Sequence, residues 1–256
     1  MSSNQLIYAA SEHNADLRYL SGFLAPDPFV YLKLKGKTYL LLSDLEVDRG
    51  RRQSQVDGVL SVSELQTEFK RRHKKAATLA DLIAVVCHNR AVKSLHVPAS
   101  FPIGLAMQLH ERGLALVPQP EPFAQKRLTK TKSESNEIAR VQAINDKAME
   151  AAYQLLRESD IHHKDQTLFV GSQPLTAELV RQTIDLVLLK ENCLGLNTIV
   201  ACGPKSADPH ERGSGTLYAG QPIIVDIFPS CRQSGFFADM TRTFCKGKAP
   251  DRLRRL

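Results

Sequence analysis

The first half of the chain alternates short β-rich runs with segments of helical periodicity. Lys35-Gly36-Lys37 separates the first two runs and predicts a hairpin, and Ser43-Asp44-Leu45-Glu46 has the spacing of a capping box that starts a short helix. One long helical stretch is expected over 62–89 and another helix over 102–112. The runs that predict strands lie at 29–35, 38–43, 59–62, 95–98 and 114–117.

The second half begins with two amphipathic helices and continues with a β-rich tail. Thr131-Lys132-Ser133-Glu134 has capping-box spacing, and a second helix is expected over 176–192. The first helix carries apolar residues at steps of three and four, at Ile138, Val141, Ile144, Ala148, Ala151 and Leu155. The inward residues expected on the second are Leu179, Val180, Ile184, Val187 and Leu188. Strands are expected at 197–201, 222–228 and 236–244.

A proline-rich stretch followed by a basic run separates these halves. Residues 118–132 contain three prolines and lack helical or strand periodicity at their start, which is typical of a linker. The sequence therefore predicts an α/β domain over 1–120, a linker over 121–132 and an α+β domain over 133–256.

Composition is that of an ordinary globular protein of 256 residues, with 43% hydrophobic and 24% charged residues, and it excludes collagen-like or wholly disordered chains. No window approaches a membrane span and the first ten residues do not resemble a signal peptide, so we expect a soluble, cytoplasmic protein without membrane contact. The five cysteines are odd in number and widely spread, which favours reduced thiols.

The basic excess comes from clusters. With 34 Lys plus Arg against 27 Asp plus Glu, the formal net charge is +7. The clusters lie at 49–52, 70–75, 126–132 and 252–255, and they have the charge needed to hold phosphates. No aromatic residues are interleaved with them as single-strand binding requires, so we expect solvated surfaces and do not expect nucleic acid as a partner.

Two aspartates flank the last predicted hairpin. A turn centred between Arg232 and Gln233 places Asp226 directly opposite Asp239, where Cβ atoms lie roughly 4.5–5.5 Å apart and like charges repel. A divalent cation between the carboxylates offsets that repulsion, and oxygen ligands favour ions such as manganese. The spacing leaves two alternatives open: hydrogen-bonded or Arg242-paired carboxylates with a structural role, and a dyad that shares one proton. A one-residue bulge would turn one aspartate to the other face.

Several motifs together resemble a known family. Three segments of the second half are similar to the catalytic domain of M24 "pita-bread" metallopeptidases, most of all the Xaa-Pro aminopeptidase or prolidase-like branch. They are Pro209-His210-Glu211, the run at 220–227 that ends in Val225-Asp226-Ile227, and the run at 237–244 that contains Asp239-Met240-Thr241-Arg242-Thr243. The runs at 14–23 and 26–29 resemble the creatinase-type N-terminal domain that precedes it.

This resemblance implies a fold, an activity and a set of site residues. The fold would be an α/β creatinase-like N-terminal domain followed by an α+β pita-bread domain truncated in its C-terminal half. Asp226 would bind one metal ion, Asp239 would bridge two, and His210 would hydrogen-bond the substrate or the tetrahedral intermediate. The two divalent ions, manganese first and cobalt, iron or zinc as alternatives, would activate water to cleave the bond before proline in a small peptide. A homodimer is implied for full-length relatives.

The sequence departs from the family pattern after Asp239. The family completes its metal site with one His and two Glu from a downstream segment, whereas residues 240–256 contain neither residue type. We therefore expect a truncated, inactive chain with weak metal binding or none. A non-catalytic pita-bread protein that binds a partner, RNA included, is one alternative. A creatinase-like amidinohydrolase is another, and the retention of both Asp226 and Asp239 speaks against it.

Overall fold

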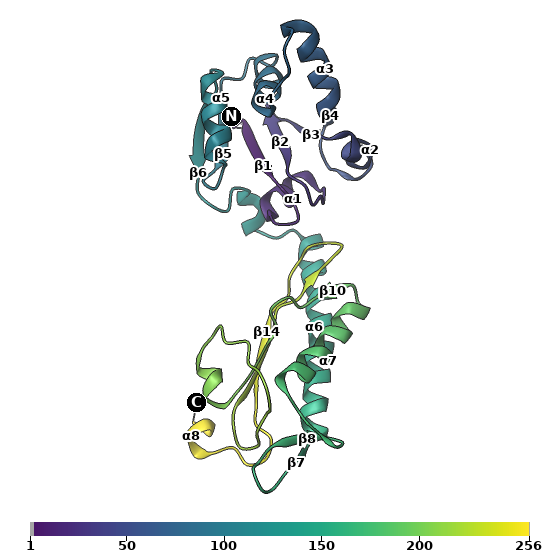
Figure 1. Cartoon of the computed structure of the whole chain (residues 1–256), viewed down its shortest axis with the longest axis vertical. Helices are drawn as coiled ribbons and strands as arrows, with labels where there is room; N and C mark the ends of the chain where they lie inside the picture. Colours follow the sequence, from purple (N-terminus) through teal and green to yellow (C-terminus); the bar gives the residue numbers. More distant parts are fainter. Residues whose placement is uncertain (1–2, 256) are drawn as a thin grey trace. The chain divides into compact units, whose positions relative to one another are not determined.

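The computed structural model describes residues 3–255, and the chain divides into two compact units, one ending at Thr129 and the other beginning at Lys130 (Figure 1). Unit 1 is built on a six-stranded sheet of order β4-β3-β2-β1-β5-β6. Strands β1 to β3 are antiparallel neighbours, while β4, β5 and β6 join in parallel. The strands are β1 Gln5–Ala9, β2 Phe29–Leu34, β3 Lys37–Leu42, β4 Gly58–Ser61, β5 Ser94–Pro98 and β6 Ala115–Gln119.

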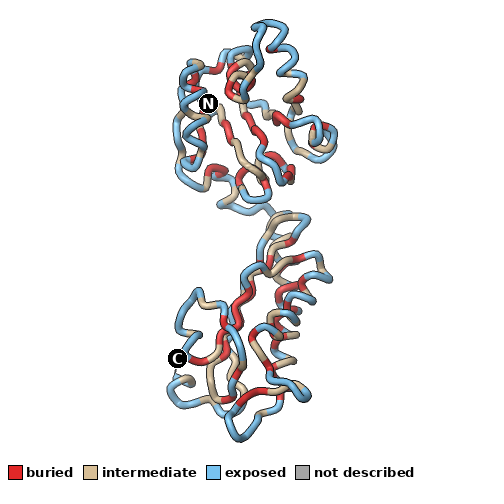
Figure 2. The backbone as a smooth tube through the Cα atoms, viewed as in Figure 1, coloured by how far each residue is buried: buried red, intermediate tan, exposed pale blue. Residues whose placement is uncertain are grey.

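The central strands of unit 1 contain many buried residues, drawn red in Figure 2, and these pack on both faces of the sheet. Leu32 and Leu34 join a cluster with α4, whereas Tyr31 packs on the other face with Leu17 of α1. Burial on both faces explains the nearly continuous apolar run of β2. The helices of unit 1 are α1 Ala15–Ser21, α2 Asp44–Gln53, α3 Val62–His73, α4 Leu79–His88, α5 Ile103–Glu111 and the 3₁₀ turn η1 Gln125–Leu128.

Two local expectations for unit 1 were wrong. The stretch expected as one helix is two, because Lys74 adopts a left-handed φ of 57° after α3 and Thr78 starts α4 with a capping box to Asp81. Ser43 precedes α2 without a side-chain capping bond. The carboxylate of Asp44 instead accepts hydrogen bonds from hydroxyl groups at the end of β4 and the start of α3.

The segment expected as a linker begins within unit 1. The carboxylate of Asp16 in α1 accepts hydrogen bonds from the backbone N–H of Phe123, at 2.8 Å, and from the guanidinium of Arg127, at 2.6 Å. The side chain of Asp16 is only 6% exposed. These bonds fasten η1 to α1, so residues 123–127 pack as part of this unit.

Unit 2 packs two long helices against one face of a three-stranded antiparallel sheet of order β11-β12-β14 (Figure 1). Its helices are α6 Lys132–Glu158, α7 Ala177–Lys190, the 3₁₀ turn η2 Gly203–Ala207 and the short α8 Asp251–Arg254. The main sheet comprises β11 Ile199–Cys202, β12 Ile223–Ile227 and β14 Met240–Phe244. Shorter strands are β7 Asp160–Ile161, β8 Leu168–Val170, β9 Gln173–Pro174, β10 Cys193–Leu194 and β13 Ser230–Cys231.

Helix α6 confirms the capping box at Thr131, whose hydroxyl accepts from the Glu134 amide while the Glu134 carboxylate accepts from the Thr131 amide. Its buried stripe passes through Val141, Ile144 and Ala148 as expected and then shifts by one position to Ala152 and Leu156. Among residues 3–255, no helix combines the length and apolar character that a membrane span requires.

Candidate functional site

Asp226 lies on β12, the central strand of the unit 2 sheet. Its neighbours Val225 and Ile227 are fully buried against the helices, so the alternation of a strand turns the half-buried Asp226 to the opposite face. Across the ladder it faces Ile199 on β11 and Thr241 on β14. The Thr241 hydroxyl donates a hydrogen bond to Asp226 Oδ1. The sheet therefore fixes both the position and the orientation of this carboxylate.

Asp239 does not lie directly opposite Asp226, and that expectation was wrong by two residues. The partner of Asp226 is Thr241, and the same register continues through the bond from Ala238 N–H to the Pro229 carbonyl and through the Ser230–Phe237 bridge. A shift of two residues preserves the side of the sheet. Asp239 thus occupies a diagonal position on the face of Asp226, where such positions are about 7–8 Å apart.

The turn between the two strands explains the shifted register. Cys231 and Phe236 close the turn through a 2.9 Å hydrogen bond from Cys231 N–H to the Phe236 carbonyl, which leaves four residues between them. Gly235, the last of these, has a φ of 74°, a left-handed conformation that glycine adopts without strain. The centre of the turn therefore lies between Gln233 and Ser234 rather than one residue earlier.

Two polar residues of α6 support this hairpin, and the sequence reading missed both. Gln142 Oε1 accepts a hydrogen bond from the Asp239 backbone N–H at 3.4 Å, and Asn145 Nδ2 donates to the Ile227 carbonyl at 2.9 Å. Asn145 is fully buried and its Oδ1 has no hydrogen-bond partner among the described residues. An asparagine within an otherwise apolar helical stripe was the available signal, because a buried amide is retained where it holds a backbone group.

His210 lies on the exposed loop that follows η2. Its backbone N–H donates to Asp208 Oδ1 at 3.0 Å, and within residues 3–255 no hydrogen bond joins its ring to Asp226 or Asp239. Arg242, the alternative partner considered for the aspartates, lies opposite the buried Val225 and donates to the Thr241 carbonyl. The structure thus brings the two aspartates to one face of the sheet and leaves His210 on a neighbouring loop.

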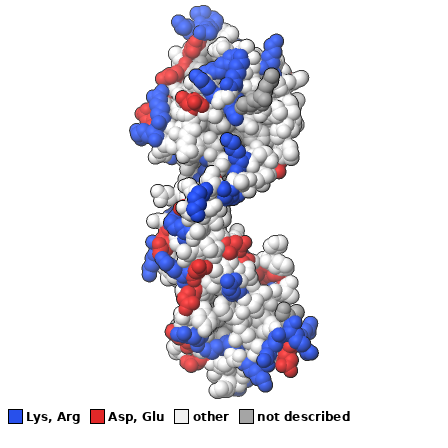
Figure 3. Space-filling view, turned by 180° about the vertical axis from the view of Figure 1, so that it is seen from behind, with Lys and Arg blue, Asp and Glu red and all other residues white. Residues whose placement is uncertain are grey.

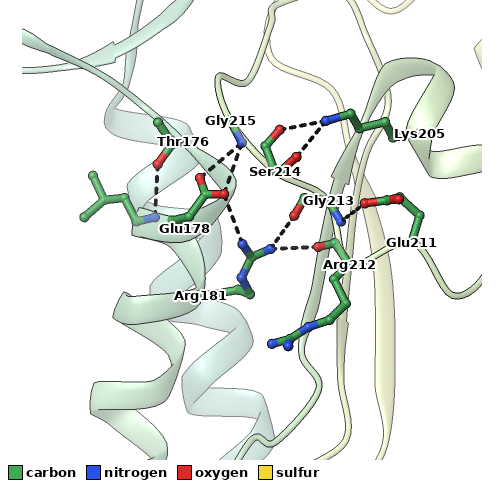
Figure 4. Close-up of polar contacts among 10 residues, drawn as sticks. Thr176, Glu178, Arg181, Lys205, Glu211, Arg212, Gly213, Ser214 and Gly215 are labelled. Carbon is green, nitrogen blue, oxygen red and sulfur yellow. Dashed lines mark hydrogen bonds and ion pairs between the residues drawn. The ribbon is translucent and has the colours of Figure 1, made fainter.

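The loop that follows His210 is braced by the start of α7 (Figure 4). Arg181 donates to the carbonyl oxygens of Arg212 and Gly213, at 2.7 and 3.0 Å, while the Glu178 carboxylate accepts from the Gly215 N–H and pairs with Arg181. Burial opposes ionisation of Glu178, yet backbone hydrogen bonds, the Gly215 amide's among them, give it a lowered pKa.

The far side of this loop is also held. Lys205 Nζ donates to the carbonyl and hydroxyl oxygens of Ser214, and Gly213 N–H donates to the Glu211 carboxylate (Figure 4). Gly213 itself touches strand β11, since a Cβ built there would lie 1.8 Å from the Val200 carbonyl oxygen. These hydrogen bonds and the close approach of Gly213 therefore fix the position of the loop relative to β11.

The donor chemistry supplies only part of a metal centre. Carboxylate oxygens such as those of Asp226 and Asp239 suit hard divalent ions. Across residues 3–255, however, no three His, Cys, Asp or Glu side chains gather closely enough to hold an ion. The described residues therefore do not complete a dinuclear centre by themselves.

The basic clusters do not form a second site as well defined as the sheet face that carries Asp226 and Asp239. Figure 3 shows Lys and Arg in several separate groups over the visible face, with Asp and Glu beside many of them. In the cluster at 49–52, Arg49 donates hydrogen bonds to the Glu46 carboxylate and the Leu24 carbonyl, so its guanidinium group has a structural role.

Comparisons with known proteins agree with the two-unit division. The family model for the creatinase/prolidase N-terminal domain matches residues 1–129, and the model for metallopeptidase family M24 matches residues 136–256. A search of curated proteins found no match.

Solved structures match both units together. An Xaa-Pro dipeptidase from Bacillus anthracis has a TM-score of 0.76 at 17% identity, over 99% of this chain and 63% of its own. An X-Pro aminopeptidase from Thermotoga maritima has a TM-score of 0.73 at 17% identity, over 98% of this chain and 65% of its own. A prolidase from Pyrococcus furiosus has a TM-score of 0.71 at 18% identity, over 99% of this chain and 65% of its own. The chain thus spans less than two thirds of the length of these proteins.

Proposed function

Since this chain belongs to metallopeptidase family M24 and carries its creatinase-type N-terminal domain, we propose that it is the larger part of a metal-dependent peptidase that hydrolyses the bond preceding proline. The substrate class is a small peptide with proline in second position. In this proposal Asp226 and Asp239 are metal ligands and His210 hydrogen-bonds the peptide. Two manganese-type ions, a homodimeric assembly and a cytoplasmic location belong to the same proposal.

One observation carries the proposal: two carboxylates share the outer face of a sheet whose other face is the core of the unit. A carboxylate oxygen lies two bonds beyond its Cβ, and metal–oxygen bonds are about 2.0–2.2 Å long. Two aspartates in diagonal positions about 7–8 Å apart therefore span the distance that a shared ion needs. The hydrogen bond from the Thr241 hydroxyl to Asp226 Oδ1 fixes the orientation of this carboxylate and leaves its second oxygen for a ligand.

The surrounding residues have defined tasks in this proposal. Gln142 accepts a hydrogen bond from the Asp239 backbone N–H, so helix α6 fixes the position of the Asp239 backbone. Arg181 and Lys205 fix the loop that presents His210, whose ring N–H would donate to the substrate carbonyl. Bound divalent ions would supply an activated water and stabilise the developing oxyanion.

The ligand count limits what this chain does alone. The resemblance assigns one His and two Glu to a segment beyond Asp239, and residues 240–256 lack both types. We therefore expect the 256-residue chain to bind Mn²⁺ weakly and to show no hydrolysis of an Xaa-Pro peptide. Robust turnover by the purified chain would contradict this incomplete ligand set.

Mn²⁺ titration followed by electron paramagnetic resonance tests the two aspartates directly. The wild-type chain should remove free Mn²⁺ signal in proportion to protein, and Asp226→Asn and Asp239→Asn should each abolish that loss. The matched control is Asp160→Asn, which neutralises an exposed aspartate on β7 and should leave binding unchanged. Equal binding by all four proteins would refute the assignment of Asp226 and Asp239 as ligands.

A further inference from the structure

Two buried cysteines face each other across a short ladder of unit 2. Cys193 on β10 pairs directly with Cys231 on β13, and their residues are 0% and 2% exposed. Both are free thiols. No feature of the proposed peptidase site uses them.

Their position in the ladder is the one that brings side chains closest. The neighbouring pair carries the hydrogen bond from Arg232 N–H to the Asn192 carbonyl, at 3.0 Å. Because hydrogen-bonded and non-hydrogen-bonded pairs alternate, Cys193 and Cys231 form a non-hydrogen-bonded pair with Cα atoms about 4.5 Å apart. A disulfide accepts Cα separations of about 4.4–6.8 Å, so these two thiols can be joined with little backbone movement.

The two thiols have different surroundings. Arg140 Nη2 donates to Cys231 Sγ at 3.0 Å. Burial disfavours the Cys231 thiolate, but hydrogen bonds from Ser234, from the Gln233 amide and from Arg140 outweigh it and lower the pKa of Cys231. Burial raises the pKa of Cys193, and the adjacent Cys231 raises it further. One sulfur is thus suited to be a nucleophile and the other to be its resolving partner.

A surface pocket reaches Cys193, the direct ladder partner of Cys231. Cys193 forms part of its lining, and the pocket volume is about 540 Å³. Leu186, Leu189 and Leu196 also line it and are more than half exposed. Glu178, Arg181, Asp185 and Arg212 line it as well, so the pocket combines apolar and charged surface and suits an uncharged oxidant.

We propose that Cys193 and Cys231 form a reversible thiol–disulfide site that is oxidised by uncharged hydroperoxides. The Cys231 thiolate attacks the peroxide, the O–O bond breaks, and the alkoxide leaves as an alcohol after taking a proton. The sulfenic acid on Cys231 is then attacked by Cys193, the S–S bond forms, and hydroxide leaves with the Cys193 proton as water. The two sulfurs lose two electrons in total and the peroxide gains them.

The bond would alter the hairpin that carries the two aspartates. Cys231 lies in the connection between Asp226 on β12 and Asp239 before β14, while Cys193 follows α7. Oxidation would therefore tie this connection to the end of α7. This inference does not depend on metal binding or on peptidase activity.

The test treats the purified full chain with cumene hydroperoxide, blocks remaining thiols with iodoacetamide, and maps tryptic peptides under non-reducing conditions by mass spectrometry. We expect one cross-linked peptide pair, containing Cys193 and Cys231, that dithiothreitol reverses. Cys193→Ser should lose the cross-link and leave a sulfenic acid on Cys231 that dimedone traps. Cys231→Ser should lose both products.

Two further variants separate this site from general thiol chemistry. Cys87→Ser should leave the cross-link unchanged, because burial raises the pKa of Cys87 to about 12. Arg140→Met should shift the pH dependence of the oxidation rate to higher pH without removing the cross-link. Free thiols at both positions in the folded, treated protein would overturn the proposal. So would a link between Cys202 and Cys245 in its place, or a cross-link that forms only in urea.

Discussion

Replacement of Gly213 by alanine tests how closely the braced loop must approach β11. Gly213 has a φ of 74°, and a Cβ there would meet the Val200 carbonyl oxygen at 1.8 Å. Real Cβ contacts essentially never fall below 3.0 Å, so the loop or the strand has to move by more than 1 Å. Gly215, two residues away, provides a matched control because its φ is 75° and nothing lies within 4 Å of its added Cβ.

The cost follows from the contacts that a displacement breaks. An alanine in the left-handed region costs about 1–2 kcal/mol, and both variants share this strain. Movement at Gly213 also breaks the bond from Val200 N–H to the Arg212 carbonyl and the two bonds from Arg181. At about 1 kcal/mol for each hydrogen bond, we expect Gly213→Ala to lose about 4–5 kcal/mol and Gly215→Ala about 1–2 kcal/mol.

Urea unfolding followed by circular dichroism measures the difference between the two variants. Because the two units can unfold separately, hydrogen exchange read by mass spectrometry assigns the loss to unit 2. Peptides that cover β11 should lose protection in Gly213→Ala and keep it in Gly215→Ala, while unit 1 peptides stay unchanged. Equal midpoints for the two variants would refute the steric argument and leave only the shared backbone strain.

Two predictions concern unit 1. The hydrogen bond from Arg112 is the main cause of the lowered pKa of Asp81, and burial opposes it. The Asp81–Arg112 pair therefore stabilises the folded state above about pH 4, and this contribution is lost as the pH falls further. Asp81→Asn should cost about 1–3 kcal/mol at pH 7, and the gap to wild type in urea midpoints should narrow progressively below pH 4; a gap independent of pH would contradict this. Asp16→Ala should release the segment held through Phe123 and Arg127, and trypsin should then cleave after Arg127 faster than in wild type, whereas an unchanged cleavage rate would show that other contacts hold it.

Secondary structure was readable where burial imposes a period. The apolar steps of α6 and the capping box at Thr131 follow from the sequence because each depends on residues three or four apart. The end of α3 at Lys74 was not readable, since a left-handed lysine leaves no compositional mark as glycine does. The capping box expected at Ser43 does not form, because the Glu46 backbone N–H donates to the Ser43 carbonyl and the Glu46 carboxylate pairs with Arg49.

The sequence indicated that Asp226 and Asp239 share one face of the sheet but not the register between them. Asp226 and Asp239 stood out as carboxylates within apolar segments, and alternation places them on one face. Their offset depends on the turn, where Gly235 sets the closing bond and moves the register by two. The supporting residues Gln142 and Asn145 lie more than eighty positions from their partners, and contacts of that separation follow only from the packed fold.

The place of the two aspartates in the sheet gives them unequal torsional freedom. Asp226 sits in the middle strand with ladders on both sides, so its backbone is ordered before anything binds. Asp239 precedes β14 and is exposed, with its N–H held by one long bond to Gln142. A ligand that binds both carboxylates would therefore meet one side chain on an ordered backbone, Asp226, and one that becomes ordered on binding, Asp239. The entropic cost of binding would fall mainly on Asp239.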